Sequence, residues 1–202
     1  MVRLCEYESK YAFLLLSLVA IPLIAEMDIV LHFWLGEVPE YAVMFCRFIL
    51  IAALCDQISV GLTSANQAVG KIRVYNLVFY TLKLTVVIIA WWCLKKGLPL
   101  ISVMGCYAGI EFITSLLRLP LMKHIADIPM LPFCKHVFLR IIVPCIAMIV
   151  TCYISVRFID LPWRLAITAT TSLIIGISTI WGFALRSEER QYIKHTITKL
   201  KK

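Results

Sequence analysis

The chain has 202 residues, of which 61% are hydrophobic and 16% charged, and its mean hydropathy is +0.90. Soluble domains average about 45–50% apolar and about 25% charged residues, so the composition excludes an ordinary soluble domain and indicates a multi-pass membrane protein. The net charge of +8 is spread over the ends of apolar runs and forms no compact basic patch. This distribution argues against a partner made of nucleic acid and favours contact with anionic lipid.

Hydropathy predicts an all-α bundle of six membrane spans in one unit, residues 1–185. The spans lie at about residues 11–35, 41–65, 74–94, 100–121, 137–156 and 163–185. Pro22 is expected to bend the first span, which lacks a small-x-small cleavage site and is therefore interpreted as retained. Residues 186–202 are expected to form a separate basic, amphipathic helix on the inner membrane surface, or else a frayed tail.

The lysines and arginines are unevenly divided between the two ends of the predicted spans. Fourteen of the twenty lie in or beside the N-terminus, the 66–73 loop, the loop between the fourth and fifth spans, and the tail. Only Lys95, Lys96, Arg157 and Arg164 lie at the opposite end. The positive-inside rule therefore predicts that both termini are cytoplasmic.

The eight cysteines contain no CxxC pair, and most lie within or at the edges of apolar spans. Small residues of this kind pack between helices in a membrane, so we expect neither a disulfide framework nor a metal site. The four histidines are isolated, and no HExxH or GxSxG motif occurs. The sequence therefore predicts no cofactor and no enzymatic centre.

The second span is the most informative stretch of the chain. At about 1.5 Å of rise per residue, Tyr41–Ala65 covers about 37 Å, enough to cross a hydrocarbon core of about 30 Å. Asp56, Ser59, Thr63 and Asn66 are spaced i, i+3, i+7 and i+10, which places them on one helical stripe. A spanning helix with one polar stripe predicts a bundle that encloses something polar.

The third and fourth spans carry similar stripes, each with a mid-span charge. Asn76, Tyr80 and Lys83 form one stripe, and Tyr107, Glu111, Thr114 and Arg118 form the other. Asp56, Lys83 and Glu111 would together cost on the order of 8–10 kcal/mol if they faced lipid, so we expect them to face protein or water. One interpretation is a buried interhelical ion pair; the other is a polar cavity for substrate headgroups or protons.

Three further charged residues are assigned to the outer interface. Arg47 lies about half a helical turn from the face of Asp56 and is expected to snorkel toward headgroups or to line the rim of the cavity. Glu26 and Asp28 lie at the outer end of the first span, where we expect contact with water.

The order of these features resembles a known transporter family. The resemblance is carried by the run FLLLSLVAIPLIAEMDIVLHFWLGEVPEYAVMF, the Ala68-Val69-Gly70-Lys71 helix end and the run RVYNLVFYTLKL. The resemblance extends over nearly the whole chain. In these stretches the sequence is similar to the O-antigen and polysaccharide flippases, which belong to the multidrug, oligosaccharidyl-lipid and polysaccharide exporter superfamily. Its marker residues are Pro22, Trp34, Leu35, Gly36, Pro39, Tyr41, Ala68, Gly70 and Lys71.

The resemblance implies the last six spans of a MATE-like, two-lobed transporter in the bacterial inner membrane. Members of the family move undecaprenyl-diphosphate-linked oligosaccharide across the bilayer by alternating access. A missing N-terminal lobe or a partner subunit is then needed to complete the cavity, and protons or another ion are candidates for coupling. The stripe geometry, rather than the family, suggests the roles: Lys83 and Arg118 would bind the diphosphate, with Arg47 at the rim, and Asn76, Tyr80 and Tyr107 would contact sugars. Asp56 and Glu111 would keep the lysine paired in the empty state or carry protons.

Other functions remain open from the sequence. A multidrug exporter of the same superfamily would need an aromatic, acidic cavity for cations, whereas lysine and arginine compete with the acids here. A truncated remnant would insert without transporting. A membrane-embedded polysaccharide polymerase or acyltransferase would need a cluster of catalytic groups at a water-facing end, and the short outer loops offer little room for one.

Overall fold

The protein is described by a computed structural model that covers residues 2–70, 72–126, 130–158, 163–186, 189–191 and 199. These segments form helices without strands. The helices are α1 (Val2–Ala25), α2 (Met27–Leu35), α3 (Ala42–Gln57), α4 (Val60–Val69), α5 (Ile72–Lys95), α6 (Leu100–Ala126), α7 (Met130–Phe158) and α8 (Arg164–Thr179), and a π-helical turn, Ile180–Ala184, follows α8.

Five of these helices are long and apolar enough to cross a membrane: α1, α5, α6, α7, and α8 with its π-helical turn. The sixth candidate span is broken, because α3 and α4 meet at an angle of 47°. Large apolar side chains cover the outward faces, for example Leu77, Leu84 and Ile88 of α5. A chain that exposes such faces needs an apolar solvent, so the all-α membrane bundle predicted from the sequence is confirmed.

The first span differs from the expected continuous helix over residues 11–35. Helix α1 already begins at Val2 and ends at Ala25, and α2 follows after Glu26. Pro22 lies in the last turn of α1 and has no backbone N–H to donate, which weakens the helix at this point. The backbone N–H of Glu26 still donates to the carbonyl oxygen of Pro22 at 3.0 Å, and the chain then changes direction.

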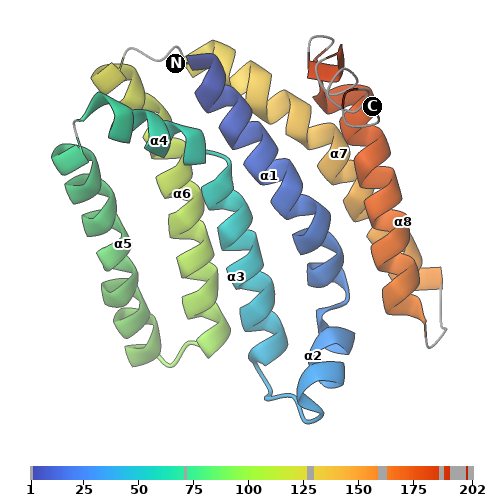
Figure 1. Ribbon diagram of the computed structural model, residues 1–202. Helices are drawn as coiled ribbons and strands as arrows, with labels where there is room; N and C mark the ends of the chain where they lie inside the picture. Colours follow the sequence, from blue (N-terminus) through green and yellow to red (C-terminus); the bar gives the residue numbers. More distant parts are fainter. Residues whose placement is uncertain are drawn as a thin grey trace.

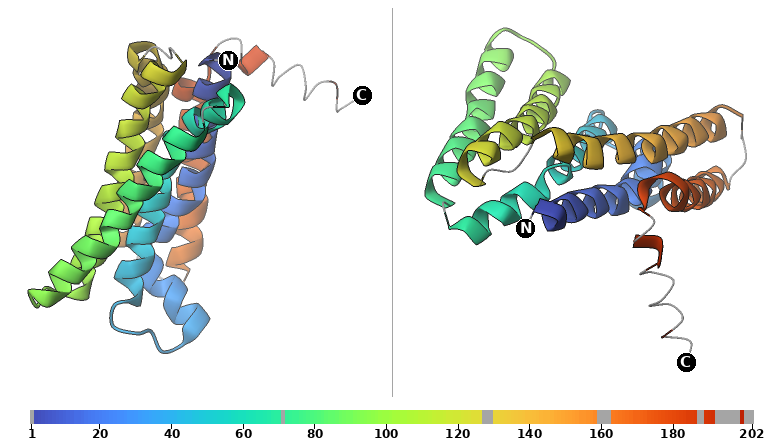
Figure 2. Two further views of the ribbon diagram at one scale, coloured as in Figure 1. Left: turned by 90° about the vertical axis from the view of Figure 1, so that its left-hand side faces the viewer. Right: turned by 90° about the horizontal axis from the view of Figure 1, so that it is seen from above.

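Helix α1 holds the bundle together (Figure 1). It packs against α7 and α8 on one side and against α3 and α4 on the other. The α5–α6 hairpin packs on α3 through α6 and on α4 through both of its helices. Figure 2, viewed from above, shows the α5–α6 hairpin and the α7–α8 pair at opposite sides of α1. We call the end of the bundle that carries the N-terminus the N-terminal end, and the opposite end the α2 end.

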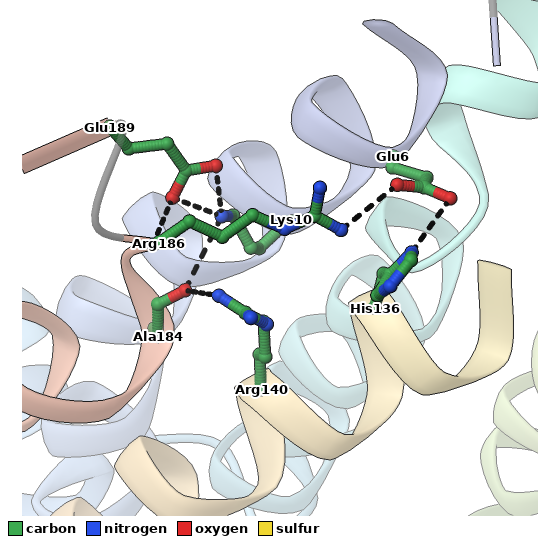
Figure 3. A network of polar contacts seen from close by, with 7 residues as sticks. All are labelled: Glu6, Lys10, His136, Arg140, Ala184, Arg186 and Glu189. Atoms are coloured by element: carbon green, nitrogen blue, oxygen red, sulfur yellow. Dashed lines mark hydrogen bonds and ion pairs between the residues drawn. The ribbon is translucent and has the colours of Figure 1, made fainter. Parts of the chain in front are cut away.

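A polar network ties α1 to neighbouring segments at the N-terminal end (Figure 3). The Lys10 ammonium lies 2.7 Å from both carboxylate oxygens of Glu189, and both side chains are buried. The Glu6 carboxylate contacts Arg186 at 3.3 Å and His136 at 3.1 Å. Lys10 therefore belongs to the packed bundle, although the sequence placed it just outside the first span. The amphipathic helix expected over residues 186–202 lies largely outside the described residues.

A second buried ion pair joins α1 to α8 at the α2 end. The Glu26 carboxylate accepts hydrogen bonds from Nε and a terminal nitrogen of Arg164, at 3.1 and 3.0 Å, and from the Thr168 hydroxyl at 2.9 Å. The Glu26 side chain is 0% exposed. The expectation that Glu26 contacts outer water is therefore wrong: the break after α1 turns the carboxylate toward α8, where a matching arginine neutralises it.

Removing Arg164 is expected to destabilise the bundle strongly. In an Arg164→Met variant, the buried Glu26 carboxylate loses its counter-charge, which costs about 3–5 kcal/mol in comparable buried pairs. The matched control is Arg157→Met on the exposed end of α7, which should change stability by less than about 0.5 kcal/mol. Thermal unfolding in detergent measures both, and equal melting temperatures for the two variants would contradict the assignment.

Two glycines allow close helix contacts at α1. A Cβ added to Gly61 of α4 would lie 2.2 Å from the Cys5 carbonyl oxygen, and one added to Gly176 of α8 would lie 2.6 Å from the Leu18 side chain. The Gly61 N–H also donates to the Ser9 hydroxyl at 3.0 Å. Small residues of this kind let helix backbones approach one another in membranes, so Gly61 fixes how the second span packs on the first.

We expect a Gly61→Ala substitution to disrupt the α1–α4 contact, because its methyl group would meet backbone atoms that cannot rotate away. The expected loss is about 1–3 kcal/mol, as for other overpacked cores. Gly109→Ala on α6 is the control, because a Cβ there meets no atom within 4 Å. Thermal unfolding in detergent measures the stability of both variants. If Gly61→Ala is as stable as Gly109→Ala, the contact between α1 and α4 is loose.

Candidate functional site

The break in the second span lies beside its mid-span acid. Helix α3 ends at Gln57 and α4 begins at Val60, so the polar stripe predicted on one straight helix is carried by two segments. The Ser59 N–H donates to the Asp56 carbonyl oxygen at 3.2 Å, which closes the turn. The bend leaves the buried Ser59 hydroxyl and the Asp56 carboxylate beside α6.

Arg118 of α6 reaches both of these groups. One terminal nitrogen of its guanidinium lies 2.8 Å from a carboxylate oxygen of Asp56, and the other donates to the Ser59 hydroxyl at 3.0 Å. Ser59 and Ser115 share a further hydrogen bond of 2.9 Å. The Arg118 guanidinium also lies 5.7 Å from the centre of the Phe79 ring of α5, within cation–π range. Arg118 therefore connects three spans.

Lys83 and Glu111 form the second ion pair, between α5 and α6. The Lys83 ammonium lies 2.9 Å from a Glu111 carboxylate oxygen. The Glu111 side chain is 5% exposed, whereas that of Lys83 is 36% exposed. The Asp56–Arg118 pair has the same asymmetry, with Arg118 buried and Asp56 36% exposed. Each pair thus has one buried member and one partly exposed member.

The two pairs belong to one electrostatic neighbourhood. Glu111 and Arg118 are seven residues apart on α6, about 10 Å along its axis. The Tyr75 hydroxyl of α5 hydrogen-bonds to Thr63 of α4 at 3.0 Å, and the Phe79 ring one turn later lies 5.7 Å from the Arg118 guanidinium. We call Asp56, Ser59, Lys83, Glu111 and Arg118 the ionic cluster.

The ionic cluster has unused hydrogen-bonding capacity. Among the described residues, two buried atoms of the ionic cluster have no hydrogen-bond partner: the second carboxylate oxygen of Glu111 and Nε of Arg118. The buried hydroxyl of Thr114, which lies between these two residues on α6, has none either. A buried polar group without a partner costs about 1–3 kcal/mol. Groups of this kind favour water or a polar ligand beside α6.

The polar stripe predicted on α5 is only partly correct. Lys83 reaches the ionic cluster, but Tyr80 is 64% exposed and lies with Asn76 and Arg73 along a shallow groove on the outer surface. The buried face instead carries Tyr75 and Phe79, each one residue earlier in the sequence. A one-residue shift turns a helix position by about 100°, which explains why spacing alone assigned the wrong tyrosine.

Tyr107 and Arg47 also lie outside the ionic cluster. Tyr107 is partly buried one turn before Glu111 on α6. Arg47 lies nine residues from Asp56 on α3, about 13 Å along the helix. Its guanidinium binds the Ile24 carbonyl oxygen at 3.0 Å and the Asp28 carboxylate at 2.6 Å. Arg47 is therefore fixed to the first span at the α2 end.

The sequence interpretation missed Tyr75 and Ser115. Ser115 lies four residues after Glu111 and three before Arg118, so helical spacing already places it on the same face. Tyr75 gave no such signal, because it lies outside the i, i+4, i+7 spacing of Asn76, Tyr80 and Lys83. Among the described residues, no group of histidines, cysteines and carboxylates could hold a metal ion.

A double-mutant cycle tests the Lys83–Glu111 pair. We expect Lys83→Met and Glu111→Gln to be coupled by about 1 kcal/mol in unfolding free energy, because each removes the same contact. The control cycle combines Glu111→Gln with Lys96→Met, whose ammonium lies over the Trp92 ring near the α2 end. That control should be additive within about 0.5 kcal/mol. Additivity in both cycles would mean that the Lys83 contact contributes nothing.

No protein-family model matches the chain, and neither the curated proteins nor the solved structures compared with it gave a match. The geometry of the helices and of the ionic cluster therefore carries the functional argument. On that geometry the chain is a multi-pass helical membrane protein with charged groups paired between its spans.

Proposed function

We propose that the chain is the C-terminal part of a flippase for lipid-linked oligosaccharide, and that the ionic cluster binds the diphosphate of the substrate. The observation that carries the proposal is a lysine at membrane depth that is 36% exposed while its carboxylate partner is buried. Ionisable groups inside a membrane are costly, and where they occur they commonly mark substrate or ion pathways.

The chemistry of the cluster suits an anionic headgroup. Arg118 is a planar donor with an unused Nε–H, and Lys83 is a compact cation on a flexible stem. A diphosphate that displaces Glu111 from Lys83 exchanges one anion for another, so the lysine is never left unpaired. Glu111 then becomes the natural place for a proton, which offers a route to ion coupling.

The bend between α3 and α4 gives the cluster a means of responding to substrate. Asp56 and Ser59 lie at this bend, and both bind Arg118 of α6. If a phosphate competes for Arg118, the contact that fixes α3 against α6 weakens, and the angle of 47° can change. Alternating access would use this change.

The proposed location is the bacterial inner membrane, with both termini cytoplasmic. The basic N-terminal end supports this orientation through the positive-inside rule. A missing N-terminal lobe or a partner subunit would face the ionic cluster and complete the cavity. Protons or another ion would drive the cycle.

A multidrug exporter is the second candidate, favoured by the buried Glu111 carboxylate and by the aromatic rings of Phe79 and Tyr75 nearby. Buried acids and aromatic faces are the groups that bind organic cations. The two candidates therefore differ in the sign of the charge that they bind. A remnant that inserts without transport would bind neither class.

Binding to the purified chain in detergent separates these candidates. We expect an undecaprenyl-diphosphate-linked oligosaccharide to bind and the cation tetraphenylphosphonium not to compete. Lys83→Met should weaken binding at least tenfold, about 1.4 kcal/mol, whereas Glu111→Gln should strengthen it by freeing the lysine. Lys96→Met is the matched control, because its ammonium lies over Trp92 and outside the cluster.

The outcomes of this measurement are distinct. Unchanged affinity in Lys83→Met would remove this lysine from the site. Competition by tetraphenylphosphonium would favour the exporter, and no binding of either ligand would favour the remnant. Flipping of a fluorescent lipid-linked sugar in vesicles then tests transport itself.

A further inference from the structure

Two cysteines lie opposite each other in the α5–α6 hairpin. Helix α5 ends at Lys95 and α6 begins at Leu100, so the two helices run antiparallel and pack on each other from the turn at the α2 end onward (Figure 1). Cys93 lies just before the end of α5, and Cys106 lies in the second turn of α6. The thiol of Cys106 has the thiol of Cys93 as its side-chain hydrogen-bonding partner. Two thiols therefore meet across the contact between these helices.

The two thiols differ in how far they are enclosed. Cys93 is 5% exposed, whereas its neighbours Trp92 and Leu94 are 52% and 50% exposed. Cys93 therefore lies on the inward face of α5, which packs on α6 at this end of the bundle. Cys106 is partly exposed. The pair thus combines one enclosed thiol with one more accessible thiol.

The pair lies close to the membrane surface at the α2 end. Cys93 is two residue steps, about 3 Å, from the last residue of α5. In the turn that follows, the Lys96 ammonium lies 3.7 Å from the centre of the Trp92 ring, and both residue types are common at the membrane–water interface. A water-soluble oxidant can therefore reach this end of the hairpin. In the orientation proposed above it faces the periplasm, where disulfides form and persist.

We propose that Cys93 and Cys106 form a reversible disulfide that links α5 to α6 at the α2 end. The oxidant is a small-molecule disulfide or the disulfide form of a thiol oxidoreductase. The more accessible Cys106 sulfur bonds to one sulfur of the oxidant and releases the other, which takes up the proton that Cys106 lost. Cys93 then bonds to the Cys106 sulfur and releases the second oxidant sulfur as a thiol. Two protein S–H bonds are replaced by one S–S bond, and the oxidant disulfide by two thiols.

The disulfide acts on the same two helices as the Lys83–Glu111 pair but through different groups. Cys93 lies ten residues after Lys83, about 15 Å along α5, and Cys106 lies five residues before Glu111 on α6. With the disulfide closed, α5 and α6 cannot separate at the α2 end, so their relative motion is restricted. This restriction does not depend on which substrate the ionic cluster binds.

Peptide mapping of the purified full chain tests the disulfide. Trypsin separates the two cysteines, because residues 84–95 contain only Cys93 and residues 97–118 contain only Cys106. The chain is reduced in detergent and treated with glutathione disulfide, and the remaining thiols are blocked with iodoacetamide before digestion. We expect these two peptides to become joined at least about tenfold faster than any other pair of cysteine peptides. Equal rates for all pairs, or blocked thiols on both peptides at equilibrium, would overturn the proposal.

Single variants test the order of attack. Cys93→Ala lacks the second thiol, so we expect one glutathione to remain on Cys106 as a mixed disulfide. In Cys106→Ala, the enclosed Cys93 should react with glutathione disulfide at least about tenfold more slowly. Cys145→Ala is the matched control, because Cys145 packs among residues of α1 and α7 with its thiol on the Ser17 hydroxyl, and it should leave the cross-link unchanged. Equal reaction of the two single variants would contradict the assigned order.

Hydrogen exchange of the wild-type chain measures the effect of the disulfide on the hairpin. We expect the backbone amides of residues 84–95 to exchange more slowly in the oxidised form than in the reduced form, whereas those of α8 exchange at the same rate in both. Identical exchange of residues 84–95 in the two forms would show that the disulfide does not restrain α5. Both wild-type measurements decide the matter even if a variant fails to fold.

Discussion

Charged groups that lie at membrane depth must find partners, and this requirement shapes the whole bundle. In hydrocarbon an unpaired ion costs several kcal/mol, so each buried charge is satisfied by a residue from another helix. Glu26 binds Arg164, Lys10 binds Glu189, and Glu111 binds Lys83. These pairs determine which helices lie next to one another. Apolar contacts are less specific, because Leu and Ile pack about as well against lipid as against another helix.

The ion pairs divide into two kinds that differ in exposure. Those that hold α1 at its two ends, around Glu26 and Lys10, are buried on at least one side and are surrounded by further hydrogen bonds. The pairs of the ionic cluster keep Asp56 and Lys83 partly exposed. The first kind suits a structural role because its members are at most 24% exposed, whereas each pair of the ionic cluster has one member that is 36% exposed. The second kind permits exchange with a ligand, which is the basis of the proposed diphosphate site.

Local breaks in the helices make these pairings possible. The turn after Pro22 directs Glu26 toward α8, and the bend at Ser59 lets Asp56 and Ser59 meet the same arginine. A straight helix at either place would have left an acid facing lipid or solvent. The close contact at Gly61 then fixes the second half of the broken span against α1. Backbone irregularity and charge pairing are therefore parts of one arrangement.

The sequence by itself determined the all-α membrane class, the approximate position of the last four spans and the presence of charges that had to be paired. Hydropathy and the cost of ions in lipid are properties of local sequence. It also led us to expect that Asp56, Lys83 and Glu111 face protein or water, and it left their partners open; the structure pairs Lys83 with Glu111 and Asp56 with Arg118. Only the tertiary structure decided the partners: Glu26 found Arg164 across the bundle, Tyr75 replaced Tyr80 on the inner face of α5, and Arg47 joined the first span. Partner choice depends on helix rotation and on the angles at the breaks, and these are set by packing between distant segments.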